Sequence, residues 1–336
     1  MTLDDFIALF VDYKAFVIIP NEQIHTSCVV MKLGDASSQV KVIATISGFI
    51  AIFLWSLTVA LLRSISETIG LFTGGAGIYA VASLCAMVSF VISSQKRQTL
   101  RNVSKSYVVV CGGLFVLCMV SLSMAVGIAD SRSQVLEVGL INYLWPAITI
   151  LSSLVILRYQ TNWLLVPGTL LALGGVFLVL TNSSTVSWEA FLANVYSNPL
   201  AYVLALVAAL TWGLYSVFTR KWAGQLNGVP LFMLMTAVVF GFVSCWVDEP
   251  RGWTMSTSLE VVAMGIATML AYSLWDYALK AGNFVIVAAA SYAIPLLSML
   301  VSAVYLDVSL TFRLWAGCGI LIGGSILSKL SVRETT

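Results

Sequence analysis

Long apolar runs separated by short polar segments fill this chain from about residue 41 to its end. A helix rises 1.5 Å per residue, so about 20 mostly apolar residues cross roughly 30 Å of hydrocarbon. Barrel strands would alternate polar and apolar positions over about ten residues, and these runs do not alternate. The pattern therefore predicts ten spanning helices, at residues 41–62, 67–93, 107–129, 133–158, 162–181, 199–219, 227–247, 259–279, 282–306 and 311–330.

The composition supports this interpretation. Hydrophobic residues make up 60% of the chain and charged residues 10%, and the mean hydropathy is +0.97. Soluble domains average roughly 45–50% apolar and about 25% charged residues. We therefore expect an all-α polytopic membrane protein.

Lysine and arginine predict the orientation, because they are enriched on the cytoplasmic side of a membrane. With the N-terminus inside, the inner side carries Lys32, Lys41, Lys96, Arg97, Arg101, Lys105, Arg158, Arg220, Lys221, Lys280, Lys329 and Arg333. The outer side carries Arg63, Arg132, Arg251 and Arg313. The twelve basic residues on one side against four on the other predict that both termini lie in the cytoplasm. The basic run at 95–106 fits a short loop between spans, and we expect no nucleic-acid partner.

Residues 1–40 lie outside this pattern and are expected to be a cytoplasmic extension, either an interfacial helix or the product of an upstream start codon. Residues 331–336 form a short cytoplasmic tail. The six cysteines show no metal-ligand spacing, so free thiols are expected, with no metal or cofactor.

The chain contains an internal repeat. Tyr143-Leu-Trp-Pro146 aligns with Tyr292-Ala-Ile-Pro295 at an offset of 292 − 143 = 149, which also carries Gly168, Gly174 and Gly175 onto Gly317, Gly323 and Gly324. Near the start of each half, Trp55 and Arg63 pair with Trp212 and Arg220. We expect a first repeat at 41–181, a periplasmic loop at 182–198 and a second repeat at 199–330. Five spans is an odd number, so the repeats are inverted, as in many secondary transporters with a site near the midplane.

Two prolines near the middle of their spans, Pro146 and Pro295, are predicted helix kinks. A proline frees a backbone carbonyl, which must find a partner inside the bundle. Asn142 and Trp145 share the face beside Pro146, so this face could line a cavity. The alternative is that both prolines are structural and that Asn142 joins helices by a hydrogen bond. Glycines at helical spacing, such as Gly70 with Gly74 and Gly319 with Gly323, are expected to let backbones approach closely.

Aromatic residues give the second signal for a site. Tyrosine and tryptophan at span ends mark the membrane interfaces, but several lie too deep for that role. Deep aromatic rings face the protein interior, where they can stack on a solute. The candidates are Tyr79, Tyr143, Trp145, Trp212, Tyr215, Trp275 and Tyr292; Tyr272 and Asp276 share a face with Trp275.

Ionisable residues within the spans are few, and such residues often serve function because a buried charge is costly. Glu137 and Asp276 are the two candidates for proton coupling. Each has an ordinary alternative, an ion pair at a helix end, with Arg132 and Lys280 respectively.

At these motifs the sequence resembles the drug/metabolite transporter superfamily, in its ten-helix branch with two EamA-type repeats. Within that branch, ISGFIAIFLWSLTVALLRSISETIG, GGAGIY and INYLWPAITIL resemble the bacterial aromatic amino acid exporters. The resemblance covers about residues 41–330. It implies an inner-membrane exporter with a central cavity between the halves. The cavity-lining positions it implies are Tyr79, Asn142, Tyr143, Trp145, Trp212, Trp275 and Tyr292, and Asp276 stands where a neutral polar residue would be expected.

We therefore expect export of aromatic or other neutral amino acids by alternating access, driven by the solute gradient or by protons. A multidrug or other metabolite exporter of the same fold is the alternative, followed by a passive channel. A membrane enzyme is not expected, since it would need a nucleophile with its base or a metal cluster, and the only histidine, His25, lies outside the spans. The expected partners are the small-molecule substrate and membrane lipid, and the chain is expected to act as a monomer.

Overall fold

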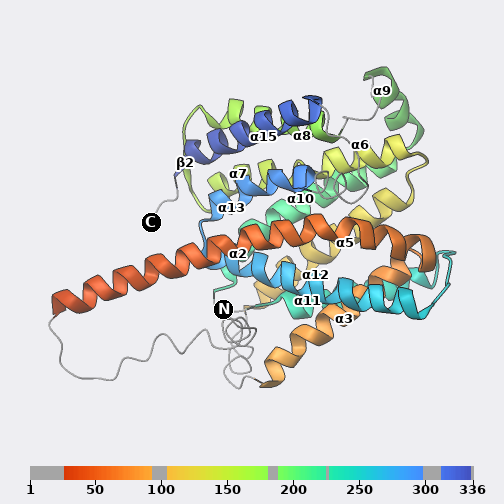
Figure 1. Ribbon diagram of the computed structural model, residues 1–336, viewed down its shortest axis with the longest axis horizontal. Coiled ribbons are helices and arrows are strands. Elements are labelled where there is room, and N and C mark those ends of the chain that lie inside the picture. The colour runs from red at the N-terminus through yellow and green to blue at the C-terminus, as the bar shows by residue number, and fades with distance from the viewer. Residues whose placement is uncertain (1–25, 93–103, 181–187, 225–226, 298–311, 334–336) are drawn as a thin grey trace.

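The computed structural model describes residues 26–92, 104–180, 188–224, 227–297 and 312–333 (Figure 1). Within these ranges the regular structure is helical apart from two antiparallel two-residue strands, β1 (Gln160–Thr161) and β2 (Val332–Arg333). The helices are α2 (Thr26–Ile69), α3 (Leu71–Ile92), the π-helical η1 (Tyr107–Cys111), α5 (Gly112–Gly127), α6 (Arg132–Asn142), α7 (Trp145–Ile156), α8 (Leu165–Leu180), α9 (Trp188–Ser197), α10 (Pro199–Trp222), α11 (Val229–Ser244), α12 (Met255–Ala281), α13 (Phe284–Ala290), the 3₁₀ helix η2 (Ser291–Ala293) and α15 (Phe312–Ser331). The all-α prediction is confirmed.

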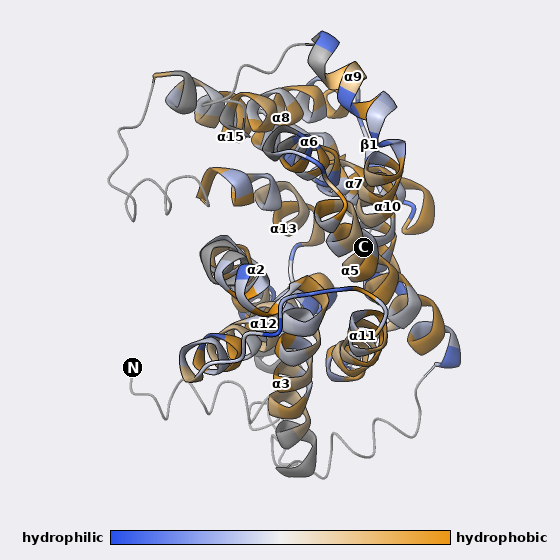
Figure 2. Ribbon diagram, turned by 90° about the vertical axis from the view of Figure 1, so that its right-hand side faces the viewer, coloured by the Kyte–Doolittle hydropathy of each residue, from blue (hydrophilic) through white to orange (hydrophobic). Residues whose placement is uncertain are grey.

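Four of the described helices are long and apolar enough to cross a membrane, at Ser38–Ser56, Tyr107–Gly127, Pro199–Trp222 and Met255–Ala281. Six shorter apolar helices lie at Leu71–Met87, Trp145–Ile156, Leu165–Leu178, Val229–Ser244, Phe284–Leu297 and Trp315–Ser331. Each of these segments falls within or over one of the predicted spans. Figure 2 shows the apolar colouring along the helices of the bundle.

Helix α2 differs from the prediction at both ends. It begins at Thr26, so residues 26–40 continue the first spanning helix instead of forming a separate extension. It also runs through the connection expected at 63–66 and ends at Ile69, because neither glycine nor proline interrupts this segment. The chain turns at Gly70, whose φ of +93° suits glycine. Residues 1–25 lie outside the described ranges.

The fourth and ninth predicted spans are interrupted at equivalent places. Helix α6 ends at Asn142, Tyr143 and Leu144 form a turn, and Pro146 is the second residue of α7. In the ninth span η2 interrupts the helix, which resumes at Ile294 with Pro295 next. Proline fits the first turn of a helix, where its missing N–H costs no hydrogen bond. Each proline therefore starts a new helical segment.

The helices pack in pairs that correspond when the two halves are exchanged. Helix α2 packs against α12 as α5 packs against α10, while α3 packs on α11 and α8 on α15. Figure 1 shows α8 and α15 side by side at one edge of the bundle, with α3 and α11 toward the other edge. This pattern fits two five-helix repeats related by a pseudo-two-fold axis.

Contacts that involve the connections between helices lie at the two ends of the bundle. At one end β1 pairs with β2, the Asn283 amide donates to Thr45 Oγ1 at 2.9 Å, and the Gly228 amide donates to the Tyr107 hydroxyl at 3.3 Å. At the other end Glu249 binds the start of α3, and Asn198 Nδ2 donates to the Ile128 carbonyl at 2.6 Å. The expected loop at 182–198 contains α9, which begins at Trp188.

The cysteine side chains that the structure describes, Cys85, Cys111, Cys118, Cys245 and Cys318, are free thiols, as predicted. Cys28 belongs to a part of α2 whose side chains are not described.

Candidate functional site

Large aromatic side chains from five helices meet where the two halves join. We define this aromatic cluster as Trp55 of α2, Phe115 of α5, Trp145 of α7, Trp212 and Tyr215 of α10, and Tyr272 and Trp275 of α12. Trp212 lies at its centre. Its ring centroid lies 5.0 Å from Tyr215, 5.6 Å from Tyr272, 5.8 Å from Trp55, 5.9 Å from Phe115, 6.2 Å from Trp145 and 6.5 Å from Trp275.

The cluster follows the symmetry of the repeat. Trp55 and Trp212 are 212 − 55 = 157 residues apart, and Phe115 and Tyr272 are separated by the same 272 − 115 = 157. Exchanging the halves turns the Trp55–Tyr272 contact, at 5.2 Å, into the Trp212–Phe115 contact, at 5.9 Å. The partners within each pair also touch, at 5.8 Å for the tryptophans and 5.2 Å for Phe115 and Tyr272. The cluster therefore lies at the pseudo-two-fold axis.

Four of the predicted site residues, Trp145, Trp212, Tyr215 and Trp275, belong to the cluster. Tyr79 reaches its border through a methionine. The hydroxyl groups of Tyr79 and Tyr272 donate to Met119 Sδ at 2.9 Å and 3.3 Å. The Tyr79 ring also packs against Phe240, with centroids 5.6 Å apart.

Three other predicted site residues lie elsewhere. Tyr292 is fully buried in a separate cluster with residues of α7, α8 and α15, and its hydroxyl has no hydrogen-bond partner. Tyr143 packs against the larger hydrophobic core that surrounds the aromatic cluster and against the cluster of Tyr292, and Asn142 is half-buried at the end of α6. The sequence predicted that these residues would line one cavity with Trp212, but Tyr292 does not join the aromatic cluster.

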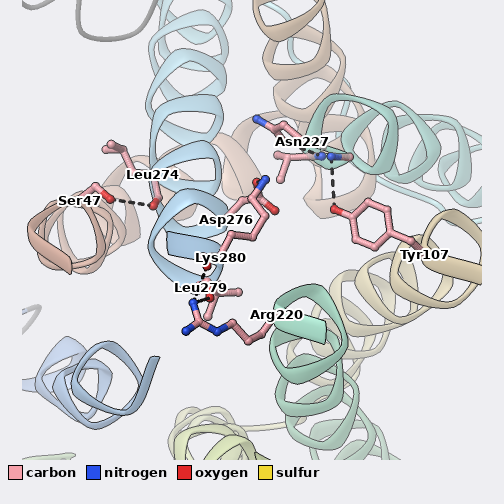
Figure 3. Close-up of polar contacts among 10 residues, drawn as sticks. Ser47, Tyr107, Arg220, Asn227, Leu274, Asp276, Leu279 and Lys280 are labelled. Carbon is pink, nitrogen blue, oxygen red and sulfur yellow. Dashed lines mark hydrogen bonds and ion pairs between the residues drawn. The ribbon is translucent and has the colours of Figure 1, made fainter. Parts of the chain in front are cut away.

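Asp276 follows Trp275 on α12 and is 1% exposed. One carboxylate oxygen forms the predicted i,i+4 ion pair with Lys280, and the other oxygen, Oδ1, has no hydrogen-bond partner. Arg220 Nη1 donates hydrogen bonds to three backbone carbonyls at the end of α12, those of Leu279 at 3.0 Å, Gly282 at 3.3 Å and Lys280. These bonds cap the C-terminus of α12. Figure 3 shows these charged groups between α12 and α10, with Tyr107 facing them from η1.

Glu137 lies at the other end of the bundle and is also 1% exposed. Its carboxylate accepts hydrogen bonds from the Tyr202 hydroxyl and from Asn194 Nδ2, the latter at 3.0 Å. The expected ion pair with Arg132 falls outside the described residues, because that side chain is not described. These bonds join α6, α9 and α10.

Sequence reasoning left Trp55, Phe115 and Tyr272 off the candidate site. Applying the 157-residue offset of Trp55 and Trp212 to the other spans would have found the Phe115–Tyr272 pair. Among the described residues, no group of three or more His, Cys, Asp or Glu side chains could hold a metal ion.

The fold and this site define a polytopic helical membrane protein with two related halves around an aromatic centre. A model of the EamA-like transporter family matches residues 199–330. The aromatic amino acid exporter YddG of Escherichia coli (strain K12) is 34% identical over 292 residues, which cover 87% of this chain and 98% of that protein. The exporter of the same name from Salmonella typhimurium (strain 14028s / SGSC 2262) is 35% identical over 295 residues, covering 87% and 98%.

One solved crystal structure, 27% identical in sequence, superposes with a TM-score of 0.70 and covers 85% of this chain and 97% of the other. The chain belongs to the EamA-like transporter family.

Proposed function

We propose that this protein is a secondary transporter that exports aromatic amino acids by alternating access. The observation that carries the proposal is the aromatic cluster at the junction of the two halves. Aromatic rings offer both stacking faces and edges to another ring, so a phenyl, phenol or indole side chain can replace a ring contact of the cluster. The relatives named as aromatic amino acid exporters support the same substrate class.

Alternating access requires each end of the cluster to open in turn, and contacts between the halves cross both ends. At the end near Asp276, Ser47 Oγ donates to the Leu274 carbonyl at 3.2 Å and the Asn283 amide donates to Thr45 Oγ1. At the opposite end Glu249 accepts from the amides of Phe72 and Thr73 at 2.7 Å and 2.8 Å. Each bond contributes about 0.5–1.5 kcal/mol, so a difference of a few kcal/mol in substrate affinity between the two states is enough to exchange one set for the other.

The proposed setting is the bacterial inner membrane, with both termini in the cytoplasm. The Asp276 end of the cluster then faces the cytoplasm, from which an exported amino acid arrives. We further propose that the protein works as a monomer surrounded by lipid, that its two repeats cover residues 41–181 and 199–330, and that it carries out no chemical reaction on its substrate. Other neutral amino acids are a second substrate group.

Efflux from cells tests the proposal. Cells expressing the protein are loaded with dipeptides of phenylalanine, tyrosine, tryptophan or leucine, and the free amino acids leaving the cell are measured. We expect efflux of the three aromatic amino acids several times faster than from cells with the empty vector, and a smaller gain for leucine. A protein of normal abundance that accelerates none of them would refute aromatic amino acid export, and resistance to unrelated drugs would then favour a multidrug exporter.

A further inference from the structure

Next to the aromatic cluster, one pair of equivalent positions in the two halves holds residues of different chemistry. Asp276 corresponds to Met119 of the first half, because 276 − 119 = 157. Met119 Sδ accepts hydrogen bonds from two tyrosine hydroxyls, whereas Asp276 pairs with Lys280. At this pair of positions one half therefore carries an uncharged thioether, and the other carries a buried carboxylate paired with a partly buried lysine. An amino acid has the same polarity, with a ring at one end and two opposite charges at the other.

The Asp276 carboxylate has spare capacity to accept a hydrogen bond. Lys280 occupies Oδ2, and the buried Oδ1 has no hydrogen-bond partner. Buried polar atoms are nearly always hydrogen-bonded, so an exception on a charged group calls for an explanation, and a bound ligand is one. A charged group inside a membrane protein carries the same implication.

The groups around Asp276 connect it to the aromatic cluster. Tyr215, a cluster residue on α10, and Tyr107 on η1 lie close enough to interact electrostatically with the carboxylate. Cys111 of η1 is within the range of the same electrostatic interaction. Arg220 approaches from α10, but its Nη1 binds backbone carbonyls at the end of α12 (Figure 3). Lys280 is therefore the cation that neutralises Asp276.

We propose that Asp276 and Lys280 bind the charged end of the amino-acid substrate while its side chain enters the aromatic cluster. The substrate ammonium donates to the Asp276 carboxylate, and the Lys280 ammonium donates to the substrate carboxylate. This inference rests on the proposed function.

A zwitterion that enters an existing ion pair brings no net charge into the membrane interior. Each of the four charges keeps an opposite partner, so the cost of burying charge is compensated. An amine without a carboxylate would leave Lys280 without its anion, and an acid without an ammonium would leave Asp276 without its cation. The site therefore selects amino acids over aromatic amines and aromatic acids.

Competition in proteoliposomes tests this inference. Exchange of labelled phenylalanine is inhibited with unlabelled phenylalanine, phenethylamine or 3-phenylpropanoate. The wild-type protein should prefer phenylalanine over both analogues by at least about tenfold, as expected for a hydrogen bond to a charged group. Asp276→Asn should lower the affinity for phenylalanine about tenfold or more and raise the affinity for 3-phenylpropanoate relative to phenylalanine. Lys280→Gln should raise the affinity for phenethylamine relative to phenylalanine.

Glu260→Gln is the matched control, the same chemical change on the same helix but at a partly exposed position, and it should leave all three affinities unchanged. Thermal stabilisation of the purified wild-type protein by the three compounds gives a second measurement that needs no variant. The inference would be overturned if the wild type bound phenylalanine and both analogues equally well. It would also be overturned if Asp276→Asn and Lys280→Gln each changed the affinities for all three compounds by the same factor. A wild-type protein that exchanges no aromatic amino acid would instead refute the proposed function.

Discussion

Helices α8 and α15 approach each other through their backbones, whereas the helices around the aromatic cluster meet through the largest side chains in the chain. A Cβ added to Gly324 would lie 2.2 Å from the backbone nitrogen of Ala172, and one on Gly175 would lie 2.4 Å from that of Leu321. At Gly168 the corresponding distance to the Ser328 nitrogen is 2.6 Å. In the cluster, by contrast, the single ring of Trp212 contacts rings from four neighbouring helices.

The two kinds of packing differ in what they can rearrange. Backbones in contact have no rotamers to change, so the α8–α15 pair can separate only by losing its packing entirely. Rings have alternative rotamers, and the ring of a ligand can replace one of their contacts. We therefore expect the α8–α15 pair to move as one body during transport and the cluster to be where the halves separate.

The largest effect should come from adding a methyl group to the α8–α15 contact. Gly324→Ala and Gly175→Ala place a carbon against backbone atoms that cannot move aside, at a cost of about 1–3 kcal/mol or more each. We expect the double variant to lose most of its folded yield in fluorescence-detected size-exclusion chromatography.

The neighbouring glycines provide a matched control. Nothing lies within 4 Å of a Cβ added to Gly323 or Gly174. Gly323→Ala and Gly174→Ala should therefore keep the wild-type yield or exceed it, because alanine favours a helix by about 1 kcal/mol over glycine. Equal yields for the two double variants would show that backbone contact does not hold this pair together.

These glycines also show the limit of prediction from sequence. Continuous apolar runs located the spanning segments well, because the length needed to cross a bilayer is a strong constraint. The rotation of each helix about its axis leaves a weaker trace in the sequence. Spacing alone suggested Gly319 and Gly323 as contact positions, but both face open space, and Gly324, one residue on, makes the contact.

The candidate site shows the same limit. Depth and aromatic character identified Trp212, Tyr215, Trp145 and Trp275, which the structure brings together. Tyr292 met the same criteria, but the turn before Pro295 directs it toward α8 and α15. The sequence could suggest an ion pair of Asp276 with Lys280, but only the tertiary structure shows that it is buried beside a cluster residue.

The second prediction concerns the centre of the cluster. Trp212→Ala removes the ring that contacts every other member, and such a truncation costs about 3–5 kcal/mol in a packed core. We expect a lower melting temperature and at least a tenfold loss of phenylalanine efflux, with part of the efflux retained in Trp212→Phe. Trp163 is 77% exposed, so Trp163→Ala should change neither quantity. Efflux by Trp212→Ala at the wild-type rate would mean that the substrate does not use these rings.

The third prediction asks which parts separate during transport. In a background without native cysteines, a disulfide between Thr45→Cys and Asn283→Cys would link the two halves where the Asn283 amide now binds Thr45. We expect oxidation to stop efflux and a reductant to restore it.

Thr161→Cys with Val332→Cys forms the control disulfide. These residues are paired in β1 and β2, next to the ends of α8 and α15, at a spacing suited to a disulfide. Since the α8–α15 pair is expected to move as one body, this link should leave efflux within about twofold of the reduced protein. A complete block by the Thr161–Val332 link would contradict the comparison between backbone and ring packing.

The smallest expected effect lies at the end opposite Asp276, where the Glu249 carboxylate binds the first turn of α3 through the amides of Phe72 and Thr73 and the Thr73 hydroxyl. Glu249→Ala removes these acceptors and the favourable negative charge at the helix N-terminus. The closed state should lose about 1 kcal/mol of stabilisation, which raises the population open at this end about fivefold. We expect a cysteine at position 72, buried in the present structure, to react several times faster with a membrane-impermeant maleimide. Asp248→Asn, at the exposed neighbouring position, should leave the labelling rate unchanged. Faster labelling without a lower melting temperature would show that the Glu249 contact holds this end closed in a protein that stays folded, whereas an unchanged labelling rate would show that the contact does not control opening at this end.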